Sequence, residues 1–245
     1  MQVTNTYGRG FPFATAVQTA STALANGIKS ARTFFYMEDQ YFVGSPKMAT
    51  AISDALSSNP GLFAVIVIAA EDSVIDTPDV GFRRRTFLQP IVSSFPGQLL
   101  VFERLGSGST TGPTAYVHSK LLIVDDEAAF IGSVNSNRRS WFHDSEIDAT
   151  IVDSGGAGGT TPGTRGWIRD FRCQLWSAHL NTASGSLGDA TTDVNLWRGV
   201  ISGTTLGASV RPYNVAAVVP RYSIKGVAVP DALLQKAWDA LEDPT

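Results

Sequence analysis

The stretch HSKLLIVD at His118–Asp125, followed by GSVN at Gly132–Asn135, decides the fold and the chemistry expected of this chain. Apolar and β-branched residues surround its polar positions, which predicts a strand over Tyr116–Val124. A polar turn at residues 125–127 follows, and the run Ala128–Ile131 predicts a second strand. The stretch therefore predicts two strands that meet at a turn.

Four polar side chains of this stretch are expected to converge. Side chains two positions apart in a strand point to one face, so His118 and Lys120 should lie together, as should Ser133 and Asn135. Each residue taken alone is ordinary in a strand or a turn. Six specified residues at fixed spacing, however, should occur by chance only about once in 10⁷ to 10⁸ positions. An imidazole, an ammonium group and a carboxamide in this arrangement indicate phosphoryl-transfer chemistry.

This spacing, HxK, four residues, Asp, six residues and GSxN, resembles the HKD signature of the phospholipase D superfamily. Asp144–Glu146 follows at the spacing where family members carry a glutamate that hydrogen-bonds the catalytic histidine. Upstream, FFYMEDQYF at Phe34–Phe42 resembles a strand of the lipid-cleaving phospholipases D. Downstream, Arg172–Leu180 resembles the helix that follows their second HKD strand pair.

The resemblance implies a role for each residue around the phosphate. A neutral His118 would attack phosphorus to give a phosphohistidine, or a protonated His118 would donate a proton to the leaving alkoxide. Glu146 would hydrogen-bond His118, and Asp125 would orient the turn without touching substrate. The other expected site residues are Lys120, Asn135 and Ser133, which would bind the phosphate, and Gln40, Tyr41 and Trp141, which would line the pocket. No metal ion and no cofactor is expected.

Superfamily chemistry uses two HKD motifs, and this chain has one. His143 and His179 have no lysine two residues later, so His143 is expected in a surface loop and His179 as a packing residue. Either two copies build one composite site, or the chain is the C-terminal half of a longer enzyme. The second alternative is favoured, because Phe34–Phe42 and the tail beyond residue 180 resemble that half. Gly8–Pro12 is also expected to precede the first helix without a strand before it.

Helix and strand patterns alternate along the chain, which predicts an α/β fold, a mixed β-sheet flanked by helices on both faces, of the phospholipase D/nuclease type. The predicted helices are Thr15–Ala31, Lys47–Ser57, Phe82–Phe95 (interrupted at Pro90) and Arg165–Leu180, and the further strands are Thr33–Met37, Leu62–Ala69, Gln98–Glu103 and Ile147–Val152. Two glycine-rich loops are expected at 106–112 and 154–163. Residues 1–180 should form a single HKD catalytic half domain. Residues 181–245 should form an extension that packs on it and leaves Trp197 and Trp238 exposed without a partner.

The composition limits the partners and the compartment. With 245 residues, 43% hydrophobic, the chain can bury a full core. The net charge of −3 indicates no nucleic-acid partner, although Arg83–Arg85 could be either a solvated helix face or a phosphate contact. The single Cys173 excludes an internal disulfide and is expected to be buried. The compartment stays open: we expect a soluble or peripheral protein, without a signal peptide in residues 1–30 and without a transmembrane segment.

These observations favour a phospholipase D-type phosphodiesterase that meets a phosphatidylcholine-like lipid at a membrane surface and releases phosphatidic acid and an alcohol, with transphosphatidylation as a side reaction. Its partner would be a second HKD half. The alternatives are an HKD nuclease, a cardiolipin synthase-like phosphatidyltransferase, or a half that is inactive without its partner.

Overall fold

The computed structural model describes residues 1–10, 12–71, 80–106, 115–153 and 166–217, and residues 223, 224, 227, 228, 230 and 233. Its helices and strands, in chain order, are β1 (Gln2–Tyr7), β2 (Val17–Gln18), α1 (Thr19–Ser30), β3 (Phe34–Asp39), α2 (Pro46–Ser58), β4 (Phe63–Ala69), α3 (Val80–Ser94), β5 (Leu99–Arg104), β6 (Leu121–Val124), β7 (Ala128–Gly132), α4 (Arg138–Phe142), β8 (Glu146–Val152), α5 (Trp167–Leu180), η2 (Ser184–Ser186), α6 (Ala190–Ser202), β9 (Val210–Pro212), β10 (Ser223–Ile224) and β11 (Val227–Ala228).

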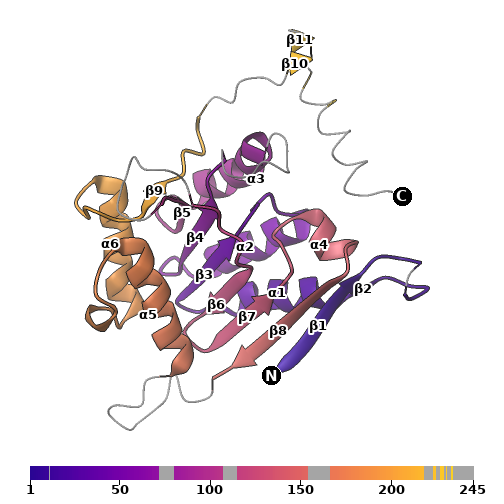
Figure 1. Cartoon of the computed structure of the whole chain (residues 1–245), viewed down its shortest axis with the longest axis horizontal. Coiled ribbons are helices and arrows are strands. Elements are labelled where there is room, and N and C mark those ends of the chain that lie inside the picture. Colours follow the sequence, from indigo (N-terminus) through magenta and orange to yellow (C-terminus); the bar gives the residue numbers. More distant parts are fainter. Residues whose placement is uncertain are drawn as a thin grey trace.

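Nine of the strands form one mixed sheet in the order β2-β1-β8-β7-β6-β3-β4-β5-β9. Strands β3, β4 and β5 are parallel, because α2 and α3 cross over between them. Strands β6, β7, β8 and β1 continue the sheet in antiparallel fashion. Helices α1 and α2 lie behind the sheet in Figure 1, and α5 and α6 lie in front of it. The predicted fold class is thus confirmed.

The two faces of β3 show why helices cover both sides of the sheet. All six of its residues are buried. Phe35 and Met37 belong to the core shared with α1, α2 and α3, whereas Phe34 and Tyr36 belong to the core shared with α5 and α6. Side chains alternate along a strand, so a strand that is buried along its whole length requires cover on both faces.

The residues beyond 180 contribute to the same core. Trp197 of α6 is 0% exposed and its ring centroid lies 5.5 Å from that of Trp176 in α5. Strand β9 pairs with β5 at the edge of the sheet. The expectation that Trp197 would be left exposed is therefore wrong, because the chain itself buries the ring. Trp238 lies outside the described residues, and the domain boundary at residue 180 stays a prediction.

The structure differs from the sequence expectation at the first helix and at Pro90, and agrees with it at Cys173. A strand does precede the first helix: β1 pairs with β8, far along the chain. Pro90 does not interrupt its helix, since α3 runs through it and buries Leu88 and Ile91 on either side. Cys173 is buried, as predicted. The two glycine-rich loops lie almost entirely outside the described residues.

Candidate active site

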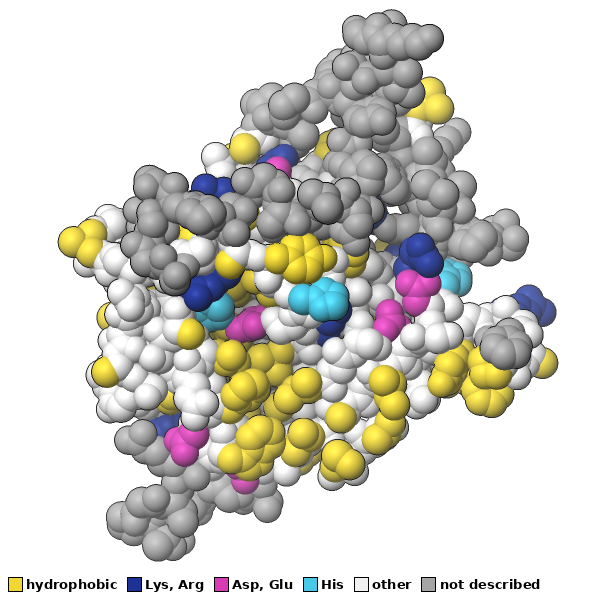
Figure 2. Space-filling view, viewed as in Figure 1, with side chains coloured by type: hydrophobic (Ala, Val, Ile, Leu, Met, Phe, Trp, Pro, Cys, Tyr) yellow, Lys and Arg dark blue, Asp and Glu magenta, His cyan; other side chains and the backbone are white. Residues whose placement is uncertain are grey.

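The predicted site residues meet at one edge of the sheet. Gln40 follows the end of β3, Lys120 precedes β6, Ser133 follows β7, and Glu146 opens β8. These strands are neighbours in the order β3, β6, β7 and β8, so their ends are brought together. Along this edge Figure 2 shows histidine side chains with basic and acidic ones beside them. The fold therefore assembles residues that lie far apart in sequence.

His118 and Lys120 do not lie in a strand, contrary to the prediction. β6 begins only at Leu121, and residues 115–120 have no regular secondary structure. His118 is exposed, and its ring stacks on that of Tyr116, with centroids 5.8 Å apart and planes at 25°. Within the described residues the ring nitrogens of His118 make no hydrogen bond. The imidazole of His118 is thus accessible from solvent, as the side chain of a nucleophile has to be.

The side chain of Lys120 is held against its own segment. Its Nζ donates to the carbonyl oxygen of His118 at 2.7 Å and to Oε1 of Gln40 at 3.2 Å. Gln40 is 3% exposed, and its Nε2 donates to the hydroxyl of Tyr116. Gln40 therefore fixes the ammonium group on one side and the tyrosine under His118 on the other.

A buried carboxylate anchors the His-Ser-Lys segment. Glu38 of β3 is 7% exposed and accepts hydrogen bonds from Ser119 Oγ and Tyr36 Oη at 2.5 Å each, and its Oε1 lies 2.8 Å from His179 Nε2. Burial alone raises the pKa of Glu38, but the contacts with His179, Ser119 and Tyr36 outweigh it and lower the pKa from 4.5 to about 2. Sequence reasoning missed Glu38. The available signal was an acidic residue at a position that the strand pattern buries.

Ser133 and Glu146 contact each other and not His118. The hydroxyl of Ser133 donates to Glu146 Oε2. The Oγ atom of Ser133 also accepts a hydrogen bond from the backbone N–H of Ile147 at 3.0 Å. Among the described residues no hydrogen bond joins His118 to Glu146 as expected, and the ring of His118 instead stacks on that of Tyr116. In the described part of the chain, the buried amide oxygen of Asn135 has no hydrogen-bond partner.

Asp125 and Asp126 form the turn between β6 and β7, and both have positive φ, 52° and 57°. The backbone N–H of Glu127 donates to the carbonyl oxygen of Val124 at 2.9 Å across these two residues, and aspartate tolerates positive φ better than most residues. The carboxylate of Asp125 accepts the backbone N–H groups of residues 32, 33 and 34 at 2.8 to 2.9 Å. That of Asp126 binds the fully buried Arg172 of α5 at 2.7 and 2.9 Å. The turn thereby ties the hairpin to β3 and to α5.

Asp39, the last residue of β3, holds the loop that carries Asn135. Its carboxylate accepts the backbone N–H groups of Tyr41, Phe42 and Ser136 at 2.7 to 2.8 Å. Complete burial raises the pKa of Asp39 although these three hydrogen bonds oppose the shift. The ends of β3 and β7 are therefore fastened together at the site.

The close approach of β8 explains why the first residue of GSVN, Gly132, is a glycine. The two residues face each other across β7 and β8. A Cβ at Gly132 would clash with Asp148 Oδ1 and with the carbonyl oxygen of Ile147, so only glycine fits. Burial, and then the nearby charge of Glu146, raise the pKa of Asp148 from 3.8 to about 7.

Several other expectations change in the structure. Trp141 was expected to line the pocket, but it is 1% exposed and packs in the core behind the sheet. Arg84 and Arg85 are not a solvated helix face, since Arg84 is 0% exposed and donates to the carbonyl oxygens of Gln40, Tyr41 and Ala69. Arg85 binds Glu71.

The described residues form neither a metal-binding cluster nor a membrane-spanning helix. No group of three or more His, Cys, Asp or Glu side chains there is placed to hold a metal ion. No described helix has the length and apolar character needed to cross a bilayer.

An exposed imidazole beside an anchored lysine, at one edge of the sheet with the GSVN loop, is the arrangement expected of one HKD half-site. The family model of phospholipase D matches residues 108–197. Phospholipase D zeta 1 of Arabidopsis thaliana is 45% identical over 94 residues, 34% of this chain and 8% of that protein. Phospholipase D B of Dictyostelium discoideum is 27% identical over 215 residues, 70% of this chain and 18% of that protein. Residues 108–197 thus form a phospholipase D superfamily region.

The chain spans less than a fifth of the length of these two relatives. Among solved structures, NucT from Helicobacter pylori aligns with 62% of this chain and 87% of its own, with a TM-score of 0.44 and 21% sequence identity.

Proposed function

We propose that this chain contributes one HKD half-site to a phosphodiesterase that cleaves phosphatidylcholine-like phospholipids. The observation that carries the proposal is the exposed imidazole of His118 next to the ammonium group of Lys120. These groups lie at the edge where the parallel strands end, which is where open α/β sheets bind ligands. The similarity to phospholipases D over residues 108–197 supports the substrate class.

In the proposed reaction His118 attacks phosphorus, a nitrogen–phosphorus bond forms, and the bond from phosphorus to the headgroup oxygen breaks. The leaving alkoxide takes a proton from a histidine of a second HKD half. Water then attacks phosphorus and gives its proton to that histidine, and phosphatidic acid leaves as His118 is regenerated. Lys120 and the amide of Asn135 would hold the phosphate oxygens, on which negative charge grows in the transition state.

An uncovered apolar surface supports the need for a second half. Helices α5 and α6 cover the front of the sheet only toward β3, β4 and β5, and hydrophobic side chains gather in the open over β7, β8 and β1 (Figures 1 and 2). The register places Val3, Ile131, Ile147 and Ala149 on this open sheet face. Val3 is 52% exposed, Ile131 37% and Ile147 56%. Such a surface is typical of an interface, and it borders the site.

The second half is proposed to be the N-terminal half of a longer chain or a second copy of this one. An isologous pair would place two copies of His118 near one another if the open sheet faces meet. Sedimentation of the purified chain distinguishes a stable dimer from a monomer that requires another polypeptide.

The test is an assay of the purified chain on phosphatidylcholine and on single-stranded DNA, with His118→Ala as the inactive variant and His143→Ala as the matched control. Once the second half is present, we expect the chain to cleave the lipid. The His118→Ala variant should lose this activity, and the His143→Ala variant should keep it. Cleavage of DNA alone would overturn the lipid assignment. Lipid cleavage that His118→Ala leaves intact would overturn the proposed nucleophile.

A further inference from the structure

The hairpin of β1 and β2 projects from the edge of the sheet that carries the candidate site. Tyr7 at the end of β1 pairs with Val17 of β2, and Thr6 pairs with Glu146, the residue that opens β8. The loop that connects β1 to β2 therefore leaves the sheet beside Glu146. Figure 1 shows this hairpin at one side of the molecule, where it extends beyond the neighbouring strands.

The loop of this hairpin is exposed and mainly apolar. Every described residue from 9 to 16 is exposed. Phe13 is 48% exposed, although its ring packs edge to face on that of Tyr7, with centroids 5.5 Å apart. Pro12 and Ala14 flank it in the sequence. Figure 2 shows hydrophobic side chains gathered on the hairpin with a basic one nearby. The loop thus presents an aromatic and apolar surface to the surroundings.

The hairpin is fastened at its base and ordered at its tip. The backbone N–H of Gly10 donates to the carbonyl oxygen of Phe13 at 3.0 Å, which closes a turn. Gly10 has a φ of +103°, which favours glycine, and a Cβ there would meet nothing within 4 Å among the described residues. At the base, a Cβ on Gly8 would clash with the carbonyl oxygen of His143, the residue that caps α4. The tip therefore stands clear of the body while its base is fixed beside the candidate site.

The charge of this region is compatible with a lipid surface. Arg9 is exposed and is the only charged side chain before Lys29. In the described part of the chain it takes part in no ion pair. The first acidic residue of the chain is Glu38, so no carboxylate on the hairpin repels lipid phosphates. Aromatic rings with an apolar body, together with basic side chains, are typical of protein segments that lie in a bilayer interface.

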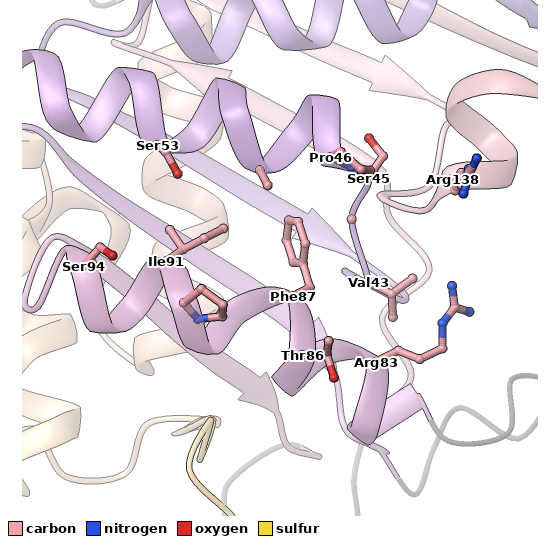
Figure 3. A pocket seen from close by; sticks show the side chains of 13 residues that line it. Val43, Ser45, Pro46, Ser53, Arg83, Thr86, Phe87, Ile91, Ser94 and Arg138 are labelled. Carbon is pink, nitrogen blue, oxygen red and sulfur yellow. The ribbon is translucent and has the colours of Figure 1, made fainter. Parts of the chain in front are cut away.

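A cavity of about 470 Å³ between α2 and α3 does not share these features. Hydroxyl groups of Ser45, Ser53, Thr86 and Ser94 line it beside apolar side chains (Figure 3). It also lies behind the sheet, whereas the hairpin loop leaves the sheet at the site edge. The hairpin is therefore the surface that the observations favour for contact with a lipid.

We propose that the tip of the β1–β2 hairpin inserts into the interface of a lipid bilayer, with Phe13 packed against Tyr7 among the acyl chains and Arg9 at the lipid phosphates. Insertion turns the site edge of the sheet toward the bilayer, because the loop leaves the sheet beside Glu146. The inference rests on the proposed function in one respect, since it takes the substrate of that site to lie in a bilayer. The contact itself needs neither His118 nor a second HKD half.

The experiment measures cosedimentation of the His118→Ala protein with vesicles of phosphatidylcholine, with and without phosphatidylglycerol. This protein leaves the lipid intact, so binding is measured apart from any enzymatic activity. Phe13→Ser should weaken binding to both kinds of vesicle about tenfold. Arg9→Gln should weaken binding about fivefold, on the anionic vesicles alone. The matched control is Leu206→Ser, which should change nothing: Leu206 is 82% exposed and precedes β9, at the opposite end of the strand order from β2.

A fluorophore on the loop tests insertion directly. The Ala14→Cys protein can be labelled with an environment-sensitive dye at this exposed position, since Cys173 is buried. We expect its emission to shift to shorter wavelength when vesicles are added. The same dye on Ser184→Cys, an exposed position in η2, should not shift. If Phe13→Ser fails to fold, this comparison decides alone.

The outcomes separate this inference from the proposed function. Absence of vesicle binding, an equal loss with Leu206→Ser, or a dye that shifts at both positions or at neither would overturn insertion of the hairpin. Vesicle binding that depends on Phe13, in a chain that cleaves no lipid even with a second half present, would uphold the hairpin contact and contradict the proposed function alone.

Discussion

Substitution of Glu38 by glutamine is the sharpest test of how the half-site is held. Glutamine keeps the size of the side chain and one acceptor oxygen, but it removes the charge that Ser119, Tyr36 and His179 stabilise. Residues 115–120 have no regular secondary structure, so this carboxylate is a main anchor of the segment that carries His118 and Lys120. We expect the variant to be less stable and less active.

The magnitude follows from the pKa of Glu38. A carboxylate whose pKa falls from 4.5 to about 2 on folding stabilises the folded state by about 3 kcal/mol at neutral pH. Because the pKa of the folded state is the lower one, this stabilisation is complete above about pH 5. It is lost as the pH falls from 4.5 toward 2, where the unfolded and then the folded carboxylate become protonated.

Urea unfolding of both proteins between pH 7 and pH 3 measures this directly. The difference in unfolding free energy between wild type and Glu38→Gln should be constant near neutrality and shrink below pH 4.5. Glu127→Gln is the matched control, since Glu127 pairs with Arg32 at the surface and should matter much less. A Glu38→Gln protein as stable as the control, or a difference that does not change with pH, would refute the reasoning.

Two further predictions concern the GSVN loop. Gly132→Ala should destabilise the protein by at least about 2 kcal/mol, because the added Cβ would clash with Asp148 and with the backbone of β8. Thermal melts compare this variant with Gly185→Ala, where a Cβ meets nothing within 4 Å. Equal melting temperatures of the two variants would contradict the prediction. Asp148→Asn should stabilise the protein at high pH: with the pKa of Asp148 raised from 3.8 to about 7, wild type loses up to about 4 kcal/mol as the pH rises through that range. Melts at pH 5 and pH 8.5 should show a gain that grows with pH, and a gain independent of pH would count against it.

The sequence predicted the sheet well because its signals are local. Strands β4 and β5 are short, mainly apolar runs, and the turn at Asp125 has aspartates where positive φ is needed. β1 was missed because a short polar strand gains its stability from β8, far along the chain. Burial of Trp197 was missed for the same reason, since its cover comes from other elements.

The candidate site was predictable as a set of residues but not as a set of contacts. The motif identified His118, Lys120, Asn135 and Glu146, and the fold brings their segments to one edge. The buried partners were not identified, because an acidic residue inside a strand has no local pattern that marks it as paired. The partner of Glu38 is His179 of α5, and the sequence had predicted only a packing role for this histidine.

The contrast between buried and exposed members of the candidate site bears on how the proposed second half would complete it. Glu38 and Asp39 are buried and fully engaged with the segments on either side of the site, so the chain holds this edge by itself. His118, in contrast, is exposed and rests on Tyr116, away from Glu146. Displacing the ring from Tyr116 costs little compared with breaking the buried network, because an aromatic pair is worth about 0.5 to 1.5 kcal/mol. A second half that meets the open sheet face therefore needs to reposition one exposed side chain and not rebuild the scaffold beneath it.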